Sequence, residues 1–218
     1  MRWWKAECGV LKRVVQMGAA IALTIASPAW AADRLVLAFG DSLTAGYRLA
    51  PTASFPAQLE AALRKGGTAA RVHNAGVSGD TSAAGKARLG WVLTGLKAKP
   101  DLVILELGAN DMLRSLNPAE TRANLDAMLG ELKRRGIPVI LAGMLASPNL
   151  GPEYRRSFDA IYPALAKKHG ATLYPFFMQG VTGNPRLLIA DGMHPNAQGV
   201  AVVVRGLAPV VKAKLSGK

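Results

Sequence analysis

The chain has almost no cysteine. Its one cysteine, Cys8, precedes an apolar run near the N-terminus, a position that suits neither a disulfide in the rest of the chain nor attachment of a lipid. Charged residues make up only 19% of the 218 residues and hydrophobic residues 50%, which excludes a disordered composition. Internal repeats and low-complexity linkers are absent too, and the length suits one domain or at most two.

Acidic residues are scarce relative to basic ones. Lys and Arg number 27 and Asp and Glu 14, so the formal net charge is +13. A basic surface attracts anionic lipid headgroups and nucleic acids. No basic block stands out, however, because Lys133, Arg134 and Arg135 form the end of a predicted helix, where cations complement the dipole. We therefore expect a solvated basic surface, at most weakly attracted to anionic lipid, and no nucleic-acid partner.

The first 31 residues have the pattern of a secretory signal peptide. A basic region with Arg2, Lys5, Lys12 and Arg13 precedes an apolar run over residues 14–26, and Ala29-Trp30-Ala31 fits a small-x-small cleavage site. The alternative is a retained membrane anchor, although the run is short for a span of about 20 residues. We predict a signal peptide over residues 1–31 and one cysteine-free domain over residues 32–218, located in the periplasm or outside the cell.

Strand-like apolar runs alternate with helical patterns along this domain. Strands are predicted over residues 35–39, 70–73, 102–107, 137–141 and 171–174, and helices over residues 55–65, 81–96, 118–135, 153–168 and 196–215. The third run is almost continuously apolar, as in a strand that is buried on both faces. The alternation predicts one α/β domain with a mostly parallel five-stranded sheet and helices on both faces.

Polar residues and glycine follow the predicted strands. Ser42 comes after the first strand, Gly79 after the second and Asn110 after the third, while Asp191 and His194 lie late in the chain. In sheets of this kind, ligands bind outside the carboxyl ends of the strands. Each feature alone is weak, because a serine at a helix start is usually a cap and Asp-x-x-His usually a turn. Their joint position at the strand ends favours a functional site.

A serine hydroxyl is a poor nucleophile at neutral pH and needs a neighbouring base. His73 lies inside a predicted strand and His169 at a helix end, whereas His194 follows Asp191 by three residues. On a turn, Asp191 can bind one ring nitrogen of His194 and leave the other to face Ser42. A metal site at Asp191 and His194 is an alternative, but no HExxH motif and no second histidine pair completes it.

Acyl transfer also needs hydrogen-bond donors that face the developing oxyanion. The candidates are the backbone N–H groups of Ser42 and Gly79 and the side-chain amide of Asn110. Their neighbours Asp41 and Asp111 suit short acceptors that cap and orient the loops better than they suit acids or bases. These residue types together indicate a nucleophile, a base with its orienting acid, and an oxyanion site.

The four segments resemble the conserved blocks of the SGNH (GDSL) hydrolases. GDSL at residues 40–43, Gly79 in NAGVSGDTS, Asn110 in GAND, and Asp191 and His194 in DGMHPN occur in order, and the resemblance spans residues 34–215. It is closest to the bacterial periplasmic thioesterases, lysophospholipases and arylesterases of that family. The resemblance implies a flavodoxin-like three-layer α/β/α sandwich, a Ser42–His194–Asp191 triad, an oxyanion hole from Ser42, Gly79 and Asn110, and no metal or cofactor. It also implies hydrolysis of aryl esters, acyl-CoA thioesters or lysophospholipids through an acyl-enzyme.

Apolar residues near these blocks are the candidate contacts for a small-molecule ester or thioester. They are Tyr47, Leu49, Met112, Leu113, Leu145, Phe177 and Met193. The alternative for several of them, Phe177 above all, is a place in the core. The segment over residues 144–152 is rich in turn formers and is predicted to be a mobile wall of the cleft.

Two other functions compete with this prediction. One is a carbohydrate O-acetyl esterase of the same superfamily, which the apolar candidates and the lack of an aromatic sugar platform disfavour. The other is a non-catalytic binding domain that kept the fold, which the presence of every catalytic position disfavours. The preferred acyl chain, the leaving group and the oligomeric state do not follow from the residues.

Overall fold

The sheet of the computed structural model is fully parallel and has five strands. The structure describes residues 33–217, so the predicted signal peptide lies outside the described residues. The strands are β1 (Arg34–Gly40), β2 (Ala70–Gly76), β3 (Leu102–Glu106), β4 (Val139–Ala142) and β5 (Thr172–Tyr174), in the order β2-β1-β3-β4-β5. All residues of β3 and β4 are buried. This arrangement confirms the predicted α/β sheet, and its strand order is that of a flavodoxin-like fold.

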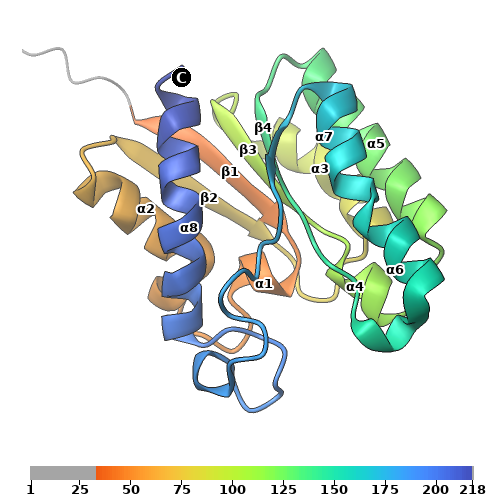
Figure 1. Cartoon of the computed structure of the whole chain (residues 1–218). Coiled ribbons are helices and arrows are strands. Elements are labelled where there is room, and N and C mark those ends of the chain that lie inside the picture. The colour runs from red at the N-terminus through yellow and green to blue at the C-terminus, as the bar shows by residue number, and fades with distance from the viewer. Residues whose placement is uncertain (1–32, 218) are drawn as a thin grey trace, which may run out of the picture. The chain divides into compact units, whose positions relative to one another are not determined.

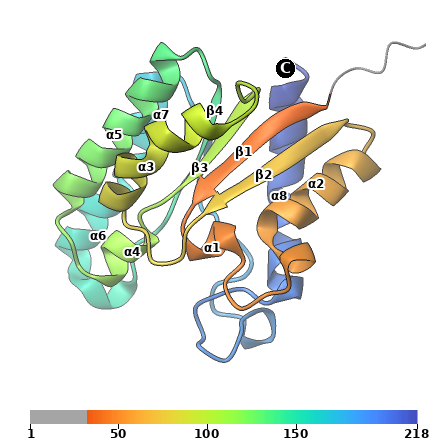
Figure 2. The same cartoon turned by 180° about the vertical axis from the view of Figure 1, so that it is seen from behind.

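Helices cover both faces of this sheet (Figures 1 and 2). Helices α2 (Phe55–Lys65) and α8 (Ala197–Leu215) pack together on one face, and α3 (Ser82–Gly95), α5 (Pro118–Arg134) and α7 (Ile161–His169) on the other. The short helices α1 (Ser42–Ala45) and α4 (Ala109–Leu113) follow β1 and β3, and α6 (Gly151–Asp159) lies between β4 and α7. Three single 3₁₀ turns occupy Pro51–Ala53, Pro148–Leu150 and Pro185–Leu187. Within residues 33–217, no helix combines the length and the apolar character that a membrane span needs.

The single helix predicted over residues 153–168 is wrong, because two helices occupy that stretch. Helix α6 ends at Asp159 and α7 begins at Ile161. Pro163 accounts for the break, since proline lacks a backbone N–H and its ring clashes with the carbonyl four residues earlier, that of Asp159. The break places Pro163 in the first turn of α7, where proline is tolerated.

Helix α3 lies unusually close to the sheet at Gly85. A Cβ atom at this position would come within 2.3 Å of Leu107 Cδ1 and 3.4 Å of Phe39 Cε1. Both neighbours are completely buried, so they have little room to move aside. The absence of a side chain at Gly85 therefore sets the distance between α3 and the ends of β1 and β3.

Two glycine substitutions in α3 should change stability in opposite directions. Gly85→Ala should lower the free energy of unfolding by about 1–3 kcal/mol, because the added methyl group overpacks the helix–sheet contact. Gly90→Ala is the matched control, since nothing lies within 4 Å of a Cβ there. It should raise stability by about 0.5–1 kcal/mol through helix propensity alone. Urea denaturation of both variants measures the difference, and equal effects would contradict this account of α3 packing.

Candidate active site

The register of the sheet brings three loops together. Gly40 at the end of β1 lies opposite Gly76 of β2 on one side and opposite Glu106 of β3 on the other. Ser42 follows the first strand end, and Gly79 and Asn110 follow the other two within a few residues. The three predicted oxyanion donors therefore emerge at one edge of the sheet, as the parallel topology requires.

Ser42 is the first residue of the four-residue helix α1. Asp41 caps this helix, because its carboxylate accepts a hydrogen bond from the N–H of Leu43 at 2.9 Å. The helix lies directly on the end of β2, where a Cβ at Gly76 would stand 2.2 Å from the backbone nitrogen of Ala45. Ser42 is 9% exposed. Its position at a helix start thus fixes both its hydroxyl and its backbone N–H.

The predicted nucleophile, base and acid form a continuous chain of hydrogen bonds. Ser42 Oγ lies 2.9 Å from His194 Nε2, and His194 Nδ1 lies 2.7 Å from Asp191 Oδ2. The other oxygen of Asp191 accepts the backbone N–H groups of Met193 and His194 at 2.9 and 3.0 Å. An acceptor carboxylate at Nδ1 fixes the tautomer with the proton on Nδ1, so Nε2 is free to accept the proton of Ser42 Oγ.

Asp191 is held in its charged form. Partial burial alone would raise the pKa of its carboxyl, but the N–H groups of His194 and Met193 and the ring of His194 outweigh burial and lower the pKa to about 2. The carboxylate is therefore ionised throughout the neutral range and can stabilise an imidazolium at His194.

Asn110 connects the loops that carry the other two donors. Its amide Nδ2 donates to Asp80 O at 3.0 Å and to Asp41 Oδ2 at 3.2 Å. Asp80 directly follows Gly79, which has a φ of +88° in the turn that Asp80 N–H closes onto Val77 O. Within residues 33–217, the N–H groups of Ser42 and Gly79 donate no hydrogen bond. The N–H groups of Ser42 and Gly79 are therefore unengaged, and the Asn110 amide binds the residue before Ser42 and the residue after Gly79.

A pair of buried carboxyl groups, Asp41 and Glu106, lies next to Ser42. The sequence did not predict this pair as part of the site. Asp41 and Glu106 are both 0% exposed. Glu106 Oε2 accepts the hydroxyl of Thr44 at 2.8 Å and the N–H of Asp41 at 3.3 Å, while Oε1 has no partner among the described residues. A signal for this group existed in the sequence, because Glu106 is the one charged residue in the apolar run 102–107.

Burial perturbs both members of this pair. It raises the pKa of Asp41 to about 6, although the Leu43 N–H, the nearby His194 and the Asn110 amide favour the charged form. Complete burial, together with the neighbouring Asp41 carboxyl, raises the pKa of Glu106 well above its ordinary value. Glu106 is therefore neutral where Asp41 is charged.

The structural roles expected for Asp41 and Asp111 are confirmed. Asp41 caps α1, and Asp111 accepts the N–H and the hydroxyl of Ser82 at the start of α3 at 2.7 and 2.5 Å. Asp111 also accepts the hydroxyl of Thr121 at 3.0 Å, which ties α4 to α5. Neither of the other two histidines lies in the site, since His169 binds Asp126 and His73 is exposed on β2.

The predicted substrate contacts fall into different places. The ring of Tyr47 lies 4.6 Å from the ring of His194, so it packs against the base. Leu113, Leu145 and Met193 are exposed by 55%, 47% and 51%. Val77, 45% exposed and two residues before Gly79, joins this group although it is not among the predicted contacts. These side chains all belong to loops or helix ends at the carboxyl edge of the sheet.

The prediction that Phe177 contacts the substrate is wrong. Phe177 is 1% exposed and packs edge-on against Phe55 with ring centroids 5.0 Å apart, so it belongs to the core. Its backbone N–H donates to Gly143 O at 2.8 Å, which turns the chain inward after β5. Met112 and Leu49 are half-buried and also pack against the core.

The predicted cleft wall over residues 144–152 is partly anchored. Met144 and Ala146 are buried, and the Ala146 N–H donates to the carboxylate of Asp159 at 2.8 Å. Leu145, between them, is exposed. The motion of this segment stays a prediction.

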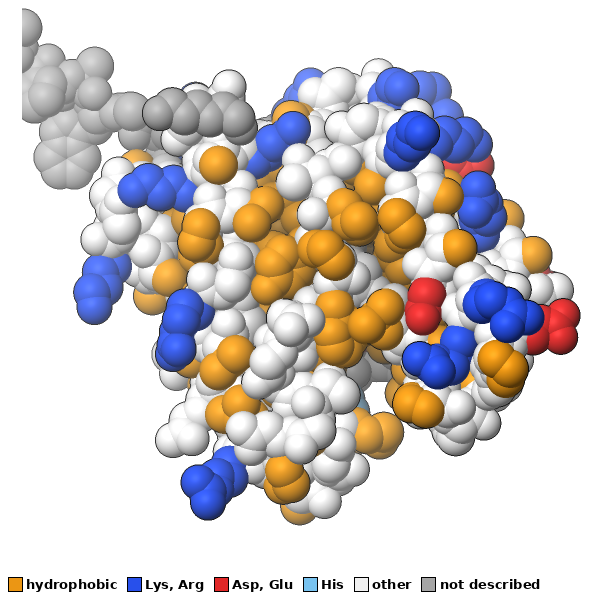
Figure 3. Space-filling view, viewed as in Figure 1, with side chains coloured by type: hydrophobic (Ala, Val, Ile, Leu, Met, Phe, Trp, Pro, Cys, Tyr) orange, Lys and Arg blue, Asp and Glu red, His pale blue; other side chains and the backbone are white. Residues whose placement is uncertain are grey.

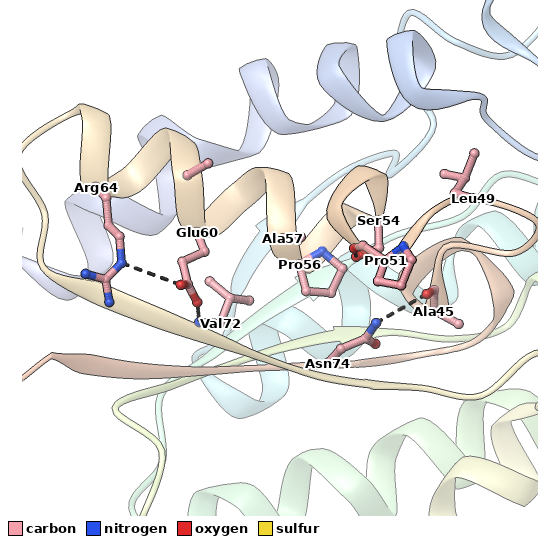
Figure 4. A pocket seen from close by; sticks show the side chains of 11 residues that line it. Ala45, Leu49, Pro51, Ser54, Pro56, Ala57, Glu60, Arg64, Val72 and Asn74 are labelled. Carbon is pink, nitrogen blue, oxygen red and sulfur yellow. Dashed lines mark hydrogen bonds and ion pairs between the residues drawn. The ribbon is translucent and has the colours of Figure 1, made fainter.

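A hollow of about 700 Å³ lies between α2 and the edge strand β2 (Figure 4), and Leu49 is the one predicted substrate contact that lines it. Its polar groups are engaged within the fold: Glu60 accepts the N–H of Val72 at 2.7 Å and pairs with Arg64, and Asn74 donates to Ala45 O at 3.2 Å. None of the residues predicted for catalysis lines it. On the face in Figure 3, Lys and Arg side chains gather most closely at the upper right and lie singly elsewhere.

Known proteins are similar to this chain in sequence and in fold. Residues 38–202 match the model of the GDSL-like Lipase/Acylhydrolase family. The chain is 37% identical over 203 residues to Esterase TesA of Pseudomonas aeruginosa, covering 93% of this chain and 100% of that protein. It is 41% identical to Thioesterase 1/protease 1/lysophospholipase L1 of Escherichia coli K12, covering 76% of this chain and 77% of that protein. The crystal structure of AlinE4, an SGNH-hydrolase family esterase, is 53% identical with a TM-score of 0.73, covering 83% of this chain and 96% of that chain.

The buried carboxyl pair predicts a pH-dependent difference in stability. In the unfolded state Glu106 loses its proton near the ordinary pKa of a glutamate, whereas in the folded state it keeps the proton to a higher pH. The free energy of unfolding should therefore fall as the pH rises from that ordinary pKa toward the raised pKa of the folded state. Glu106→Gln keeps an acceptor oxygen for Asp41 and Thr44 but cannot titrate. The variant should therefore gain stability relative to the parent chain between pH 5 and 7, by up to about 1.4 kcal/mol per pH unit.

Urea denaturation at several pH values measures this difference. Glu120→Gln is the control, because Glu120 is exposed in the first turn of α5. Parallel stability profiles for the parent chain and Glu106→Gln would show that Glu106 is charged in the folded state.

Proposed function

The chain belongs to the GDSL-like lipase/acylhydrolase family, and from this premise we propose that it is a serine hydrolase of carboxylic esters and thioesters. The observation that carries the proposal is the chain of hydrogen bonds from Ser42 Oγ through His194 to the ionised Asp191. A nucleophile, a base and an orienting acid in this order are what acyl transfer to a serine requires.

In the acylation step, His194 Nε2 accepts the proton of Ser42 Oγ as that oxygen attacks the acyl carbonyl carbon. Asp191 keeps the ring oriented through Nδ1 and stabilises the imidazolium that forms. When the tetrahedral intermediate collapses, the imidazolium gives its proton to the leaving alcohol or thiol. Water then attacks the acyl-enzyme with His194 again as the base, and the carboxylic acid leaves Ser42.

The negative oxygen of the tetrahedral intermediate is stabilised by the N–H groups of Ser42 and Gly79 and by the amide of Asn110. The two N–H groups have no other acceptor among residues 33–217. The bonds of the Asn110 amide to Asp80 O at 3.0 Å and to Asp41 Oδ2 at 3.2 Å hold this donor in place beside the proposed oxyanion. Donors fixed before the reaction contribute most to such transition states.

The acyl group is apolar in this proposal. Val77, Leu113, Leu145 and Met193 are exposed large hydrophobic side chains at the edge of the sheet where Ser42 lies. Apolar side chains around a few fixed polar groups are typical of small-molecule sites. The names of the relatives, an esterase and a thioesterase/lysophospholipase, agree with an ester or thioester of this kind.

The location and the surface charge complete the proposal. We propose that the protein is exported, because residues 1–31 have the pattern of a signal peptide. A weak attraction to anionic lipid surfaces is proposed because the formal net charge is +13, of which residues 1–31 supply +3 and the exported remainder +10.

Ser42→Ala tests the proposed reaction. The variant should stay folded and lose ester hydrolysis by at least about 10⁴-fold in kcat, because no other nucleophile replaces the hydroxyl. The assay is hydrolysis of p-nitrophenyl esters and acyl-CoA thioesters from acetyl to palmitoyl, which also identifies the preferred acyl chain and leaving group. Ser157→Ala, in the exposed part of α6, is the control and should keep full activity. Retained activity in Ser42→Ala would exclude Ser42 as the nucleophile.

A further inference from the structure

We propose that Arg88, on α3, is a positioning residue that holds the N–H groups of Ser42 and Gly79 at the separation the oxyanion needs. The proposal rests on the hydrolytic function proposed above. Arg88 does not belong to the predicted site, and its position in the middle of a helix gives no sequence signal of a role in catalysis. The contacts of its guanidinium group carry the inference.

The guanidinium of Arg88 makes three contacts at the end of β1. Its Nε donates to Asp80 Oδ2 at 2.6 Å, and its Nη2 donates to the carbonyl of Gly40 at 2.9 Å. The guanidinium carbon lies 4.0 Å from the centre of the Phe39 ring. The side chains of Arg88 and Asp80 are only 18% and 11% exposed, so the ion pair is partly shielded from water.

These contacts join the two segments that carry the backbone donors. Gly40 lies two residues before Ser42, and Asp80 directly follows Gly79. The amide of Asn110 makes a second bridge between the same segments, from Asp41 to the carbonyl of Asp80. A backbone hydrogen bond from Val77 N–H to Gly40 O at 3.0 Å joins the same segments. Three polar bridges therefore set the distance between the two loops, and Arg88 makes one of them.

Packing alone does not hold the Gly79 turn in place. Val77, Ser78 and Gly79 are exposed, and no atom lies closer than 3.9 Å to a Cβ built on Gly79. The nearest atom there belongs to Arg114, whose guanidinium donates to Gly79 O at 3.0 Å but is itself exposed. A turn with so few apolar contacts depends on its hydrogen bonds for its position.

Arginine suits this task better than lysine does. Its planar group presents Nε–H and Nη2–H in a fixed geometry, so a single side chain can bind the carboxylate of Asp80 and the carbonyl of Gly40 together. Helix α3 brings Arg88 within reach because Gly85, one turn earlier, lets the helix approach the sheet. A lysine ammonium can replace one of these contacts but lacks the fixed fork.

Replacement of Arg88 should lower kcat and leave KM nearly unchanged, since oxyanion donors act in the transition state. Arg88→Met should reduce kcat for p-nitrophenyl acetate by about 10- to 100-fold, because small displacements of catalytic groups have effects of that size. The affinity of a boronic acid, which binds the serine as a tetrahedral adduct, should fall by a similar factor. The loss of kcat should be smaller in Arg88→Lys than in Arg88→Met, and Asp80→Asn should lose about as much kcat as Arg88→Lys.

Arg34→Met is the matched control. Arg34 pairs with Asp101 at 2.8 Å, and Asp101 also accepts the N–H of Leu35, so this ion pair ties loops at the opposite end of β1. Arg34→Met should leave kcat within about twofold of the parent value, because surface ion pairs contribute little to the stability of a fold. Thermal unfolding of each variant is measured in parallel, and if Arg88→Met does not fold, Arg88→Lys decides the question.

Unchanged kcat in folded Arg88 variants would overturn the proposal. So would equal losses in the Arg34 and Arg88 variants, or a loss of kcat without a loss of boronic acid affinity. These results differ from a failure of the proposed function, in which the parent chain itself would hydrolyse no ester or thioester.

Discussion

The parallel pairing of β1 with β2 and β3 is the constraint on which the rest of the site depends. Gly40 is in register with Gly76 on one side and with Glu106 on the other, so three loops leave the sheet side by side. The lack of side chains at Gly40 and Gly76 lets α1 lie directly on the strand ends. A change of register by one residue would separate Ser42 from its proposed donors and send the side chains of the shifted strand to the opposite faces of the sheet.

The polar groups beneath Ser42 explain how so small a helix is held in one position. Asp41 accepts hydrogen bonds from Leu43 and Asn110, and its own N–H donates to Glu106. Burying two carboxyl groups this close is unfavourable unless one of them stays neutral, which the raised pKa of Glu106 achieves. The same network holds Ser42, the proposed nucleophile, and the amide of Asn110, the proposed oxyanion donor, so folding and the proposed chemistry depend on the same atoms.

Most of the fold and the centre of the site follow from the sequence because both depend on where strands end. Apolar runs locate β1, β3 and β4, and the polar residues after them include Ser42 and Asn110. The break between α6 and α7 was missed although Pro163 marks it, because the apolar pattern continues through it. Arg88 was missed for a different reason: local patterns do not tell which side chain of a helix reaches a loop that is distant in sequence. For Phe177 the local pattern predicts a substrate contact, but the side chain points into the core.

The central claim is that the hydroxyl of Ser42 attacks the acyl carbon with His194 as its base. The most direct measurement is peptide mass spectrometry of the protein after reaction with a fluorophosphonate. The account predicts one phosphonyl adduct, on the peptide that contains Ser42, and a much slower reaction in His194→Ala. An adduct on another residue, or an equal rate without His194, would contradict it.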